Sequence, residues 1–185
     1  MKLRFLAILC ISLWICGCNT YEKPPAAFHG VLVQPYKLEA SDQIRITVYG
    51  QSDLTNTYMV DQDGNIFFPL IGQVPAKGHT QAQLAALITR KLKAGYIREP
   101  DVSVEVAQYR PIFVMGEVSS SGQYPFIAGM TAQNAIATAG GFTSRANQRD
   151  IDITRQIDGK IFSARTLITD PLRPGDTIYV RERFF

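Results

Sequence analysis

Two segments with one shared pattern decide the fold: Leu38-Glu-Ala-Ser-Asp42-Gln-Ile44-Arg-Ile46 and Leu172-Arg-Pro-Gly-Asp176-Thr-Ile178-Tyr-Val180. Each has Leu, three residues, Asp, one residue, Ile, one residue and a β-branched residue. An Asp side chain can hydrogen-bond its own backbone turn, and the alternation after it is typical of a half-buried strand. We therefore expect one turn-and-strand device in each of two units, with structural rather than catalytic roles for both Asp residues.

Strands and one clear helix are predicted around the first copy. Residues 44–48 and 102–106 alternate apolar and polar side chains, as strands do. Two β-rich runs flank Asp61-Gln62-Asp63-Gly64-Asn65, which favours a hairpin. Thr80 and Gln83 have capping-box spacing before the apolar helical face, and Gly95 stands where a left-handed C-terminal cap is expected. That face consists of Leu84, Leu87, Ile88 and Leu92. The cations of the last turns are interpreted as a solvated face in preference to a binding patch.

The segment after this helix predicts a second mixed unit. An apolar strand over 112–118 stops at a Ser-rich turn, and Thr131 caps a short helix that ends at Gly140-Gly141. Asp158-Gly159 predicts another hairpin before the closing strand at 178–180. The interleaved strands and helices predict an α+β architecture of two small mixed domains with a seam near 108–111.

The start of the chain reads as an export signal. Lys2 and Arg4 precede an apolar run over 5–15, which is too short to span a bilayer. The run closes on Ile15-Cys16-Gly17-Cys18, which resembles a bacterial lipobox. This resemblance implies a lipoprotein signal peptide over 1–17, with Cys18 lipidated as the first residue of the mature chain. An ordinary signal with a chance cysteine is the alternative.

Composition limits what the mature chain can do. The full chain has 19 Lys and Arg against 16 Asp and Glu, and Lys2 and Arg4 belong to the signal, so the mature protein is close to neutral. No global field would recruit nucleic acid. The three cysteines all lie in or at the signal, so disulfides are not expected. Residues 18–35 are predicted to be a flexible tether, with a short strand at 31–33.

These motifs, in this order, resemble the bacterial polysaccharide export family of outer-membrane lipoproteins. The resemblance implies a polysaccharide export sequence domain over 36–108 and a β-grasp-like SLBB (soluble-ligand-binding β-grasp) domain over 109–185. It covers nearly the whole mature chain, with Ser41 in place of the family's usual Gly. The motifs are Tyr36-Lys-Leu38, Val60 to Ile66, Pro69-Leu70-Ile71-Gly72, Pro100-Asp101-Val102, Gly116-Glu117-Val118, Gly122-Gln-Tyr124, Ala139-Gly140-Gly141 and Pro174-Gly175-Asp176.

The family implies a function and partners. The chain is expected to be a periplasmic ring component of a capsule or exopolysaccharide export machine. Asn19, in place of Asp after Cys18, points to the outer membrane. The partners would be the polysaccharide, further copies of the chain and an inner-membrane polysaccharide co-polymerase. Because the chain stops at Phe185, we expect a short form without the family's pore helix, which leaves open a separate outer-membrane β-barrel partner. Phe184-Phe185 would pack on a neighbour.

Neither an enzyme nor a cofactor is indicated. His29 and His79 are far apart in sequence, and no metal-ligand spacing, phosphate loop or nucleophile motif is present. Glu117 and Asp150 would be a candidate acidic pair for glycoside cleavage, but any chain with this many carboxylates supplies such pairs. The only site residue is Cys18, for lipidation, and no ligand-binding residue is assigned. The rival function is a monomeric lipoprotein that binds a glycan or a partner protein.

Overall fold

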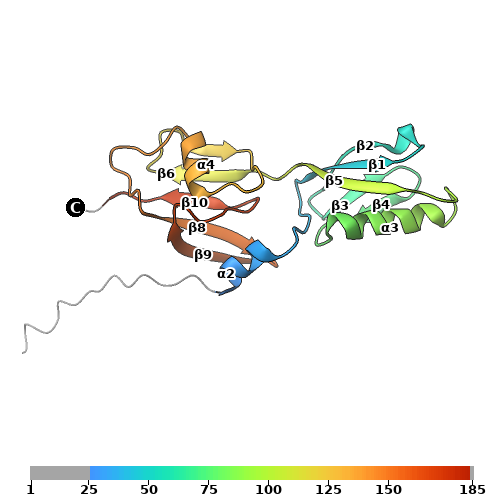
Figure 1. Ribbon diagram of the computed structural model, residues 1–185, viewed down its shortest axis with the longest axis horizontal. Coiled ribbons are helices and arrows are strands. Elements are labelled where there is room, and N and C mark those ends of the chain that lie inside the picture. The colour runs from blue at the N-terminus through green and yellow to red at the C-terminus, as the bar shows by residue number, and fades with distance from the viewer. Residues whose placement is uncertain (1–25, 184–185) are drawn as a thin grey trace, which may run out of the picture.

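The computed structural model describes residues 26–183, in which two small α+β units follow one another along the long axis (Figure 1). The predicted fold class is confirmed. The first unit contains β1 (Gln43–Val48), η2 (Ser52–Leu54), β2 (Asn56–Met59), β3 (Asn65–Phe68), β4 (Gly72–Pro75), α3 (Gln81–Lys93) and β5 (Val102–Gln108).

The first unit pairs its strands in two sheets. One sheet has the order β2-β1-β5, with antiparallel neighbours, and the other is the β3–β4 hairpin. The alternation in β1 buries Ile44, Ile46 and Val48, as the sequence pattern predicts. α3 buries Leu84, Ile88 and Leu92 in the same core. Burial of one face from each element therefore gives this unit its own hydrophobic core.

The second unit is built on one five-stranded mixed sheet. Its order is β7-β6-β10-β8-β9, and the pair β6–β10 is parallel while the other pairs are antiparallel. α4 contributes Ala132, Ala135 and Ile136 to the core on one face of this sheet. The elements are β6 (Ile112–Gly116), β7 (Gly122–Tyr124), α4 (Ala132–Thr138), β8 (Asp150–Ile157), β9 (Lys160–Leu167) and β10 (Thr177–Val180).

Both predicted helix starts and one predicted hairpin are confirmed. Thr80 caps α3 and Thr131 caps α4, each in a reciprocal capping box. Asp158 and Gly159 join β8 to β9 with φ angles of 48° and 78°. Positive φ at both central residues is what the tight hairpin turn requires.

Two local predictions are wrong. The segment 61–65 is a tight turn in which the Asp61 N–H donates to the Asn65 carbonyl at 2.8 Å, but its flanking strands enter different sheets. The hairpin forms one step later, where β3 pairs with β4. Gly95 is not among the residues with positive φ, and α3 ends instead with the Tyr96 and Ile97 N–H groups donating to the Leu92 carbonyl. A short sequence pattern does not show whether a turn joins two strands of one sheet or leads into another sheet, or in which way a helix ends.

The segment before Tyr36 also differs from the predicted tether and strand. Ala26–Gly30 form the helix α2, and Val31–Val33 form the single 3₁₀ turn η1. Phe28 is 1% exposed and belongs to the core of the second unit, although it precedes the first unit in sequence. The physical reason is that one aromatic side chain buries enough apolar surface to dock a short segment. Of the predicted tether, residues 18–25 lie outside the described residues, as do the signal and Phe184-Phe185.

No helix within residues 26–183 combines the length and the apolar character needed to cross a membrane.

Candidate functional site at the seam between the units

The two repeated turns have the same internal geometry. The Glu39 N–H donates to Asp42 Oδ2 at 2.9 Å, and the Arg173 N–H donates to Asp176 Oδ2 at 2.8 Å. Both carboxylates are buried, at 0% and 1% exposure. Each Asp therefore holds the turn that feeds its strand, so the structural role predicted from the repeat is confirmed.

The turns differ in the residue before Asp. Ser41 has φ 71° and Gly175 has φ 83°, so both occupy the left-handed region. A Cβ at Gly175 would lie 2.3 Å from Arg110 Nε. Gly175 thus gives the Arg110 side chain room to lie against the second unit's turn.

Asp42 connects its own turn to the start of the second unit. The Tyr36 hydroxyl donates to Asp42 Oδ2 at 2.6 Å, and the Arg110 backbone N–H donates to Asp42 Oδ1 at 2.9 Å. The Arg110 Nη1 group donates in turn to the Tyr36 hydroxyl at 3.3 Å. Burial, chiefly, raises the pKa of the Tyr36 phenol, and Asp42 adds to this while Arg110 opposes it. Tyr36 is therefore a neutral donor at physiological pH.

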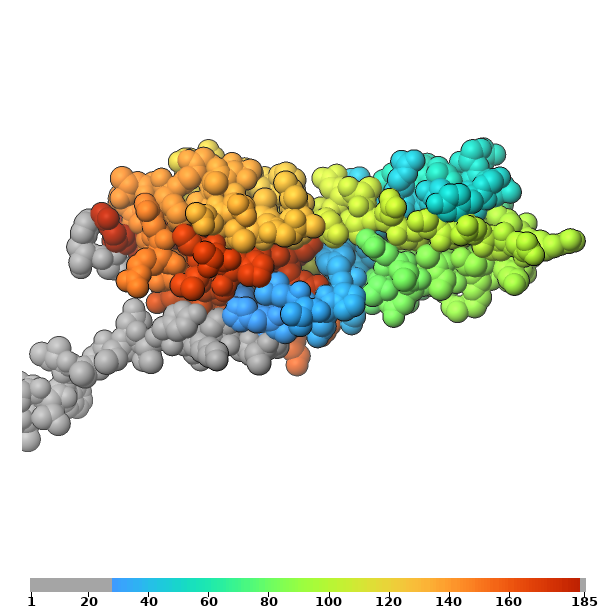
Figure 2. All heavy atoms as spheres, in the orientation of Figure 1, coloured from blue at the N-terminus to red at the C-terminus, as the bar shows by residue number. Residues whose placement is uncertain are grey.

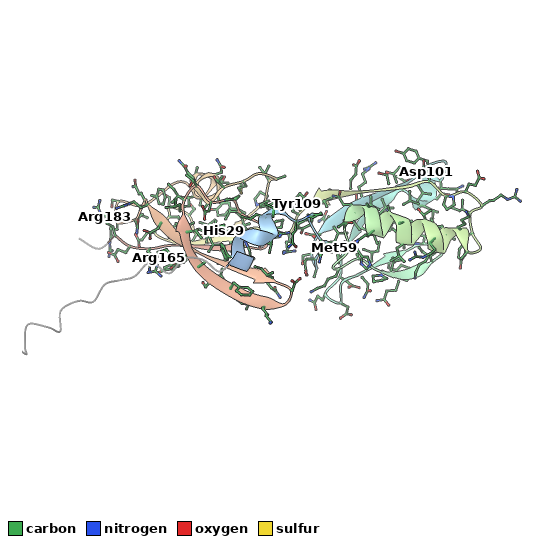
Figure 3. All side chains as sticks on the ribbon, turned by 60° about the horizontal axis from the view of Figure 1, so that its bottom comes forward. His29, Met59, Asp101, Tyr109, Arg165 and Arg183 are labelled. Atoms are coloured by element: carbon green, nitrogen blue, oxygen red, sulfur yellow. The ribbon has the colours of Figure 1, made fainter. Side chains whose placement is uncertain are left out.

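Aromatic rings continue this connection into the second unit. The Tyr109 ring lies edge-on to Tyr36 at 5.1 Å between centroids, and edge-on to Phe126 at 5.5 Å. Figure 3 places Tyr109 at the junction of the two units. Such edge-to-face contacts favour a defined orientation of the rings. The linker around Tyr109 is thus packed on both sides.

Asp176 connects its turn to the docked N-terminal segment through Arg155. Arg155 is 1% exposed and pairs with Asp176 through Nε and Nη2, the latter at 2.6 Å. Its Nη1 donates to the Phe28 carbonyl at 2.7 Å, and its guanidinium lies 4.4 Å from the centroid of the Phe28 ring. Its Nη2 also donates to the Pro171 carbonyl at 3.2 Å, so the buried charge is compensated by a carboxylate, two carbonyls and an aromatic face.

A cavity of about 200 Å³ opens at this seam, with walls from both units and from the N-terminal segment. Figure 2 shows that segment, in blue, lying across the junction of the units. The residues that matter for its chemistry are Tyr36, Lys37, Arg110, Arg155, Asp158 and Arg173. This cleft is the candidate functional site.

Arg173 is a half-buried cation of the cleft. Burial lowers its pKa most, and the neighbouring Arg155 charge lowers it further. Its Nη1 donates to the Val31 carbonyl, and its guanidinium lies 5.9 Å from the Tyr36 ring centroid. Within the described residues 26–183, Arg173 makes no ion pair.

The residues considered for chemistry from sequence do not form a common site. His29 contacts Asp170 at 3.2 Å on the outside of α2, and His79 contacts the Lys77 carbonyl in the loop before α3.

Glu117 accepts a hydrogen bond from Thr143 at 2.6 Å, and Asp150 accepts one from Asn147 at 3.1 Å. The two carboxylates therefore have separate local partners. Cys18 lies outside the described residues.

Sequence reasoning missed the arginines of the cleft. Arg155 stands in β8 at a position whose neighbours Ile151 and Ile153 are buried, and this break in an apolar alternation was the available signal. Arg110 and Arg173 gave none, because an arginine beside a turn is usually solvated.

The fold and the contacts at the seam define the class of protein. It consists of two small α+β units in series, and the second unit is an SLBB domain. Residues 32–107 match the family model described as polysaccharide biosynthesis/export protein, and residues 111–163 match the SLBB domain model. The chain belongs to the bacterial polysaccharide export family, which confirms the resemblance found in the sequence.

Curated relatives carry the corresponding names. The exopolysaccharide production protein ExoF of Rhizobium meliloti is 32% identical over 124 residues, which is 60% of this chain and 30% of that protein. The polysialic acid transport protein KpsD of Escherichia coli is 32% identical over 123 residues, 65% of this chain and 22% of that protein. The capsule polysaccharide export protein BexD of Haemophilus influenzae is 26% identical over 182 residues, 92% of this chain and 41% of that protein. The chain thus spans less than half the length of these relatives.

Proposed function

We propose that this protein is a periplasmic ring component of a capsule or exopolysaccharide export machine, anchored to the outer membrane. One observation carries the proposal: two family models match the chain in consecutive segments, 32–107 and 111–163, with hardly a gap between them. On this basis we assign 36–108 to the polysaccharide export sequence domain and 109–185 to the SLBB domain. We assign no catalytic role.

Membrane attachment is proposed through Cys18. Its position after Ile15-Cys16-Gly17 supports cleavage before Cys18 and lipidation of its thiol. Stable anchoring takes two or more acyl chains, since each buried CH₂ contributes about 0.8 kcal/mol. A Cys18→Ser variant tests the anchor: the protein should lose incorporated labelled palmitate and leave the membrane fraction. Retention of both would contradict lipidation at this position.

Assembly is proposed to be head-to-tail between copies of the chain, because such interfaces close into rings when the rotation allows. Further partners in this proposal are the polysaccharide and an inner-membrane polysaccharide co-polymerase. Native mass measurement of the detergent-solubilised lipoprotein tests the ring. A protein that stays strictly monomeric across concentrations would favour the rival, a monomeric lipoprotein that binds a glycan or a partner.

Deletion of the gene is the experiment that tests the function itself. The expected result is loss of surface or secreted polysaccharide, with polymer retained inside the cell and restored export on complementation. The matched control is complementation with the Cys18→Ser form, which should fold but lack its anchor. Unchanged polysaccharide at the surface of the deletion strain would overturn the export role.

A further inference from the structure

The seam cleft contains more positive charge than its carboxylates balance. Four cations line it: Lys37, Arg110, Arg155 and Arg173. Arg155 is neutralised by Asp176 at 2.6 Å, and the lining carboxylate of Glu39 is itself engaged by Lys77 at 2.9 Å. Asp158, at the tip of the β8–β9 hairpin, is the remaining acidic lining residue and is exposed.

Arg173 and Arg110 present guanidinium groups that the protein uses only in part. Arg173 donates from Nη1 to one carbonyl, and Arg110 donates from Nη1 to the Tyr36 hydroxyl. In residues 26–183 the structure gives the other guanidinium nitrogens of these two side chains no hydrogen-bond acceptor. A half-buried guanidinium without a counter-charge is costly, and a bound anion would offset that cost. Burial, chiefly, and the neighbouring Arg155 charge lower the pKa of Arg173, although the Asp176 carboxylate opposes them.

We propose that the seam cleft binds the carboxylate of an acidic sugar residue, with Arg173 as the principal contact and Arg110 and Lys37 as supporting cations. The identification of a sugar rests on the proposed function. A guanidinium offers two parallel N–H donors that match the two oxygens of a carboxylate. The remaining walls include the Tyr36 ring, Pro35 and Pro174, which are apolar surfaces that suit the face of a sugar ring.

The location gives such binding a structural consequence. The cleft is bounded by Tyr36 of the first unit, by Arg173 of the second and by Gln34 of the segment that precedes both. A ligand there touches all three parts at once. It would therefore stabilise one orientation of the two units, in addition to the contacts that Asp42 already makes across the seam.

Isothermal titration of the purified, detergent-solubilised protein with trigalacturonate tests the proposal. The fully methyl-esterified trimer is the matched probe, since it has the same sugars without the charges. We expect the acid to bind at least about tenfold more tightly than the ester, and its affinity to fall as salt is raised. Equal affinity for the acid and the ester would overturn the proposal.

Variants locate the site. Arg173→Gln should weaken trigalacturonate binding by about tenfold or more, and Lys37→Gln, at an exposed rim position that the fold does not need, by a few-fold. Arg149→Gln removes the same charge just before β8, at the end of that strand away from the cleft, and should leave binding unchanged. Loss of binding in Arg149→Gln alone, or no loss in both cleft variants, would refute the assignment.

Two further measurements distinguish a sugar-carboxylate site from a general oxyanion site, and the cleft proposal from the proposed function. If inorganic phosphate displaces trigalacturonate at similar concentration, the cleft is a general oxyanion site and the commitment to a sugar carboxylate is wrong. If the wild-type protein does not bind trigalacturonate although gene deletion abolishes export, the cleft inference fails while the proposed function stands. Intact thermal unfolding of each variant shows that a loss of binding is not a loss of fold.

Discussion

The backbone N–H of Arg110 donates to the carboxylate of Asp42 at 2.9 Å, across 68 residues of sequence and across the seam between the units. The same carboxylate accepts from the Tyr36 hydroxyl and from the Glu39 N–H. A single buried side chain therefore closes the turn that starts β1 and holds the first residues of the second unit. Asp42 therefore connects the two units, in addition to the ring contacts of Tyr109.

Asp42→Asn should accordingly destabilise the protein. The amide keeps the shape but loses the negative charge and turns one acceptor into a donor that faces N–H and O–H groups. Loss of hydrogen bonds to a buried charged group costs about 1.5–3 kcal/mol, and we expect a decrease of that size in the free energy of unfolding by urea. Asp63→Asn, at an exposed turn position, is the control and should change stability by less than about 0.5 kcal/mol. Equal effects of the two substitutions would contradict the role of Asp42.

Tyr36 should make stability depend on alkaline pH. Its pKa in the folded protein is raised, chiefly by burial and further by Asp42, while the unfolded chain titrates at the ordinary value of about 10. Below that pH both states keep the proton, and above it the unfolded state releases the proton first, so stability is lost as pH rises. The loss due to this group is at most about 1.4 kcal/mol per pH unit.

The comparison that isolates this effect is Tyr36→Phe. At neutral pH the variant should be less stable by about 1 kcal/mol because one hydrogen bond is missing, and the two stability curves should converge above about pH 10. Tyr49→Phe, at a ring that is 63% exposed, should run parallel to the wild type. Curves of Tyr36→Phe and wild type that stay parallel up to about pH 11 would exclude Tyr36 as the titrating group.

The residues before the two Asp turns should respond to substitution in opposite directions. Ser41→Gly relieves a left-handed backbone at φ 71° and is expected to be neutral or to stabilise by up to about 1 kcal/mol. Gly175→Ser introduces the same strain together with a Cβ 2.3 Å from Arg110 Nε, and should destabilise by about 1–2 kcal/mol or more. Denaturant unfolding of both variants measures the difference. A stabilising Gly175→Ser would show that Arg110 does not need this space.

The sequence predicts the individual elements of this protein better than it predicts which strands pair and which segments pack together. The caps at Thr80 and Thr131 and the hairpin at Asp158-Gly159 were predictable because each depends on neighbouring residues only. Pairing of β3 with β4 rather than β2, and docking of Phe28 on the second unit, depend on surfaces far apart in sequence. The repeated Leu-x₃-Asp pattern revealed both turns.

The cleft itself could not be predicted, for the same physical reason. Its four cations come from four separate places in the chain, and Arg110 and Arg173 look like ordinary solvated arginines in sequence. Only Arg155 interrupts an alternation of buried apolar residues. Its partner Asp176 gives no signal of an ion pair, because its role in the turn before β10 already explains an Asp at this position. A site assembled across a seam has no local signature of its own.

Docking of the N-terminal segment should depend on Phe28. This side chain is fully buried against the second unit, so Phe28→Ala removes its packing and its contact with the Arg155 guanidinium. We expect amide hydrogen exchange over 26–33 to become fast, and the stability of the second unit to fall by about 2 kcal/mol or more. Val33→Ala is the control, since Val33 is 89% exposed and should change neither quantity. Unchanged protection of 26–33 in Phe28→Ala would mean that the remaining contacts of the segment, which include the bonds from Arg155 and Arg173 to its carbonyls, hold it without the Phe28 ring.

Arg155 and Asp176 should behave as one unit in a double-mutant cycle. Each single change leaves a buried charge without its partner, so Arg155→Met and Asp176→Asn should each cost about 3–5 kcal/mol. The double variant buries neither charge, and its cost should be smaller than the sum of the two single costs by at least about 1 kcal/mol.

Arg145 and Glu182 form an exposed pair in the same unit, at 67% and 46% side-chain exposure, and provide the control cycle. Their coupling should be much weaker than that of the buried pair, because water screens both charges. Additive costs at Arg155 and Asp176 would contradict a coupled pair, and would assign the destabilisation in Arg155→Met to its lost contacts with Phe28 instead.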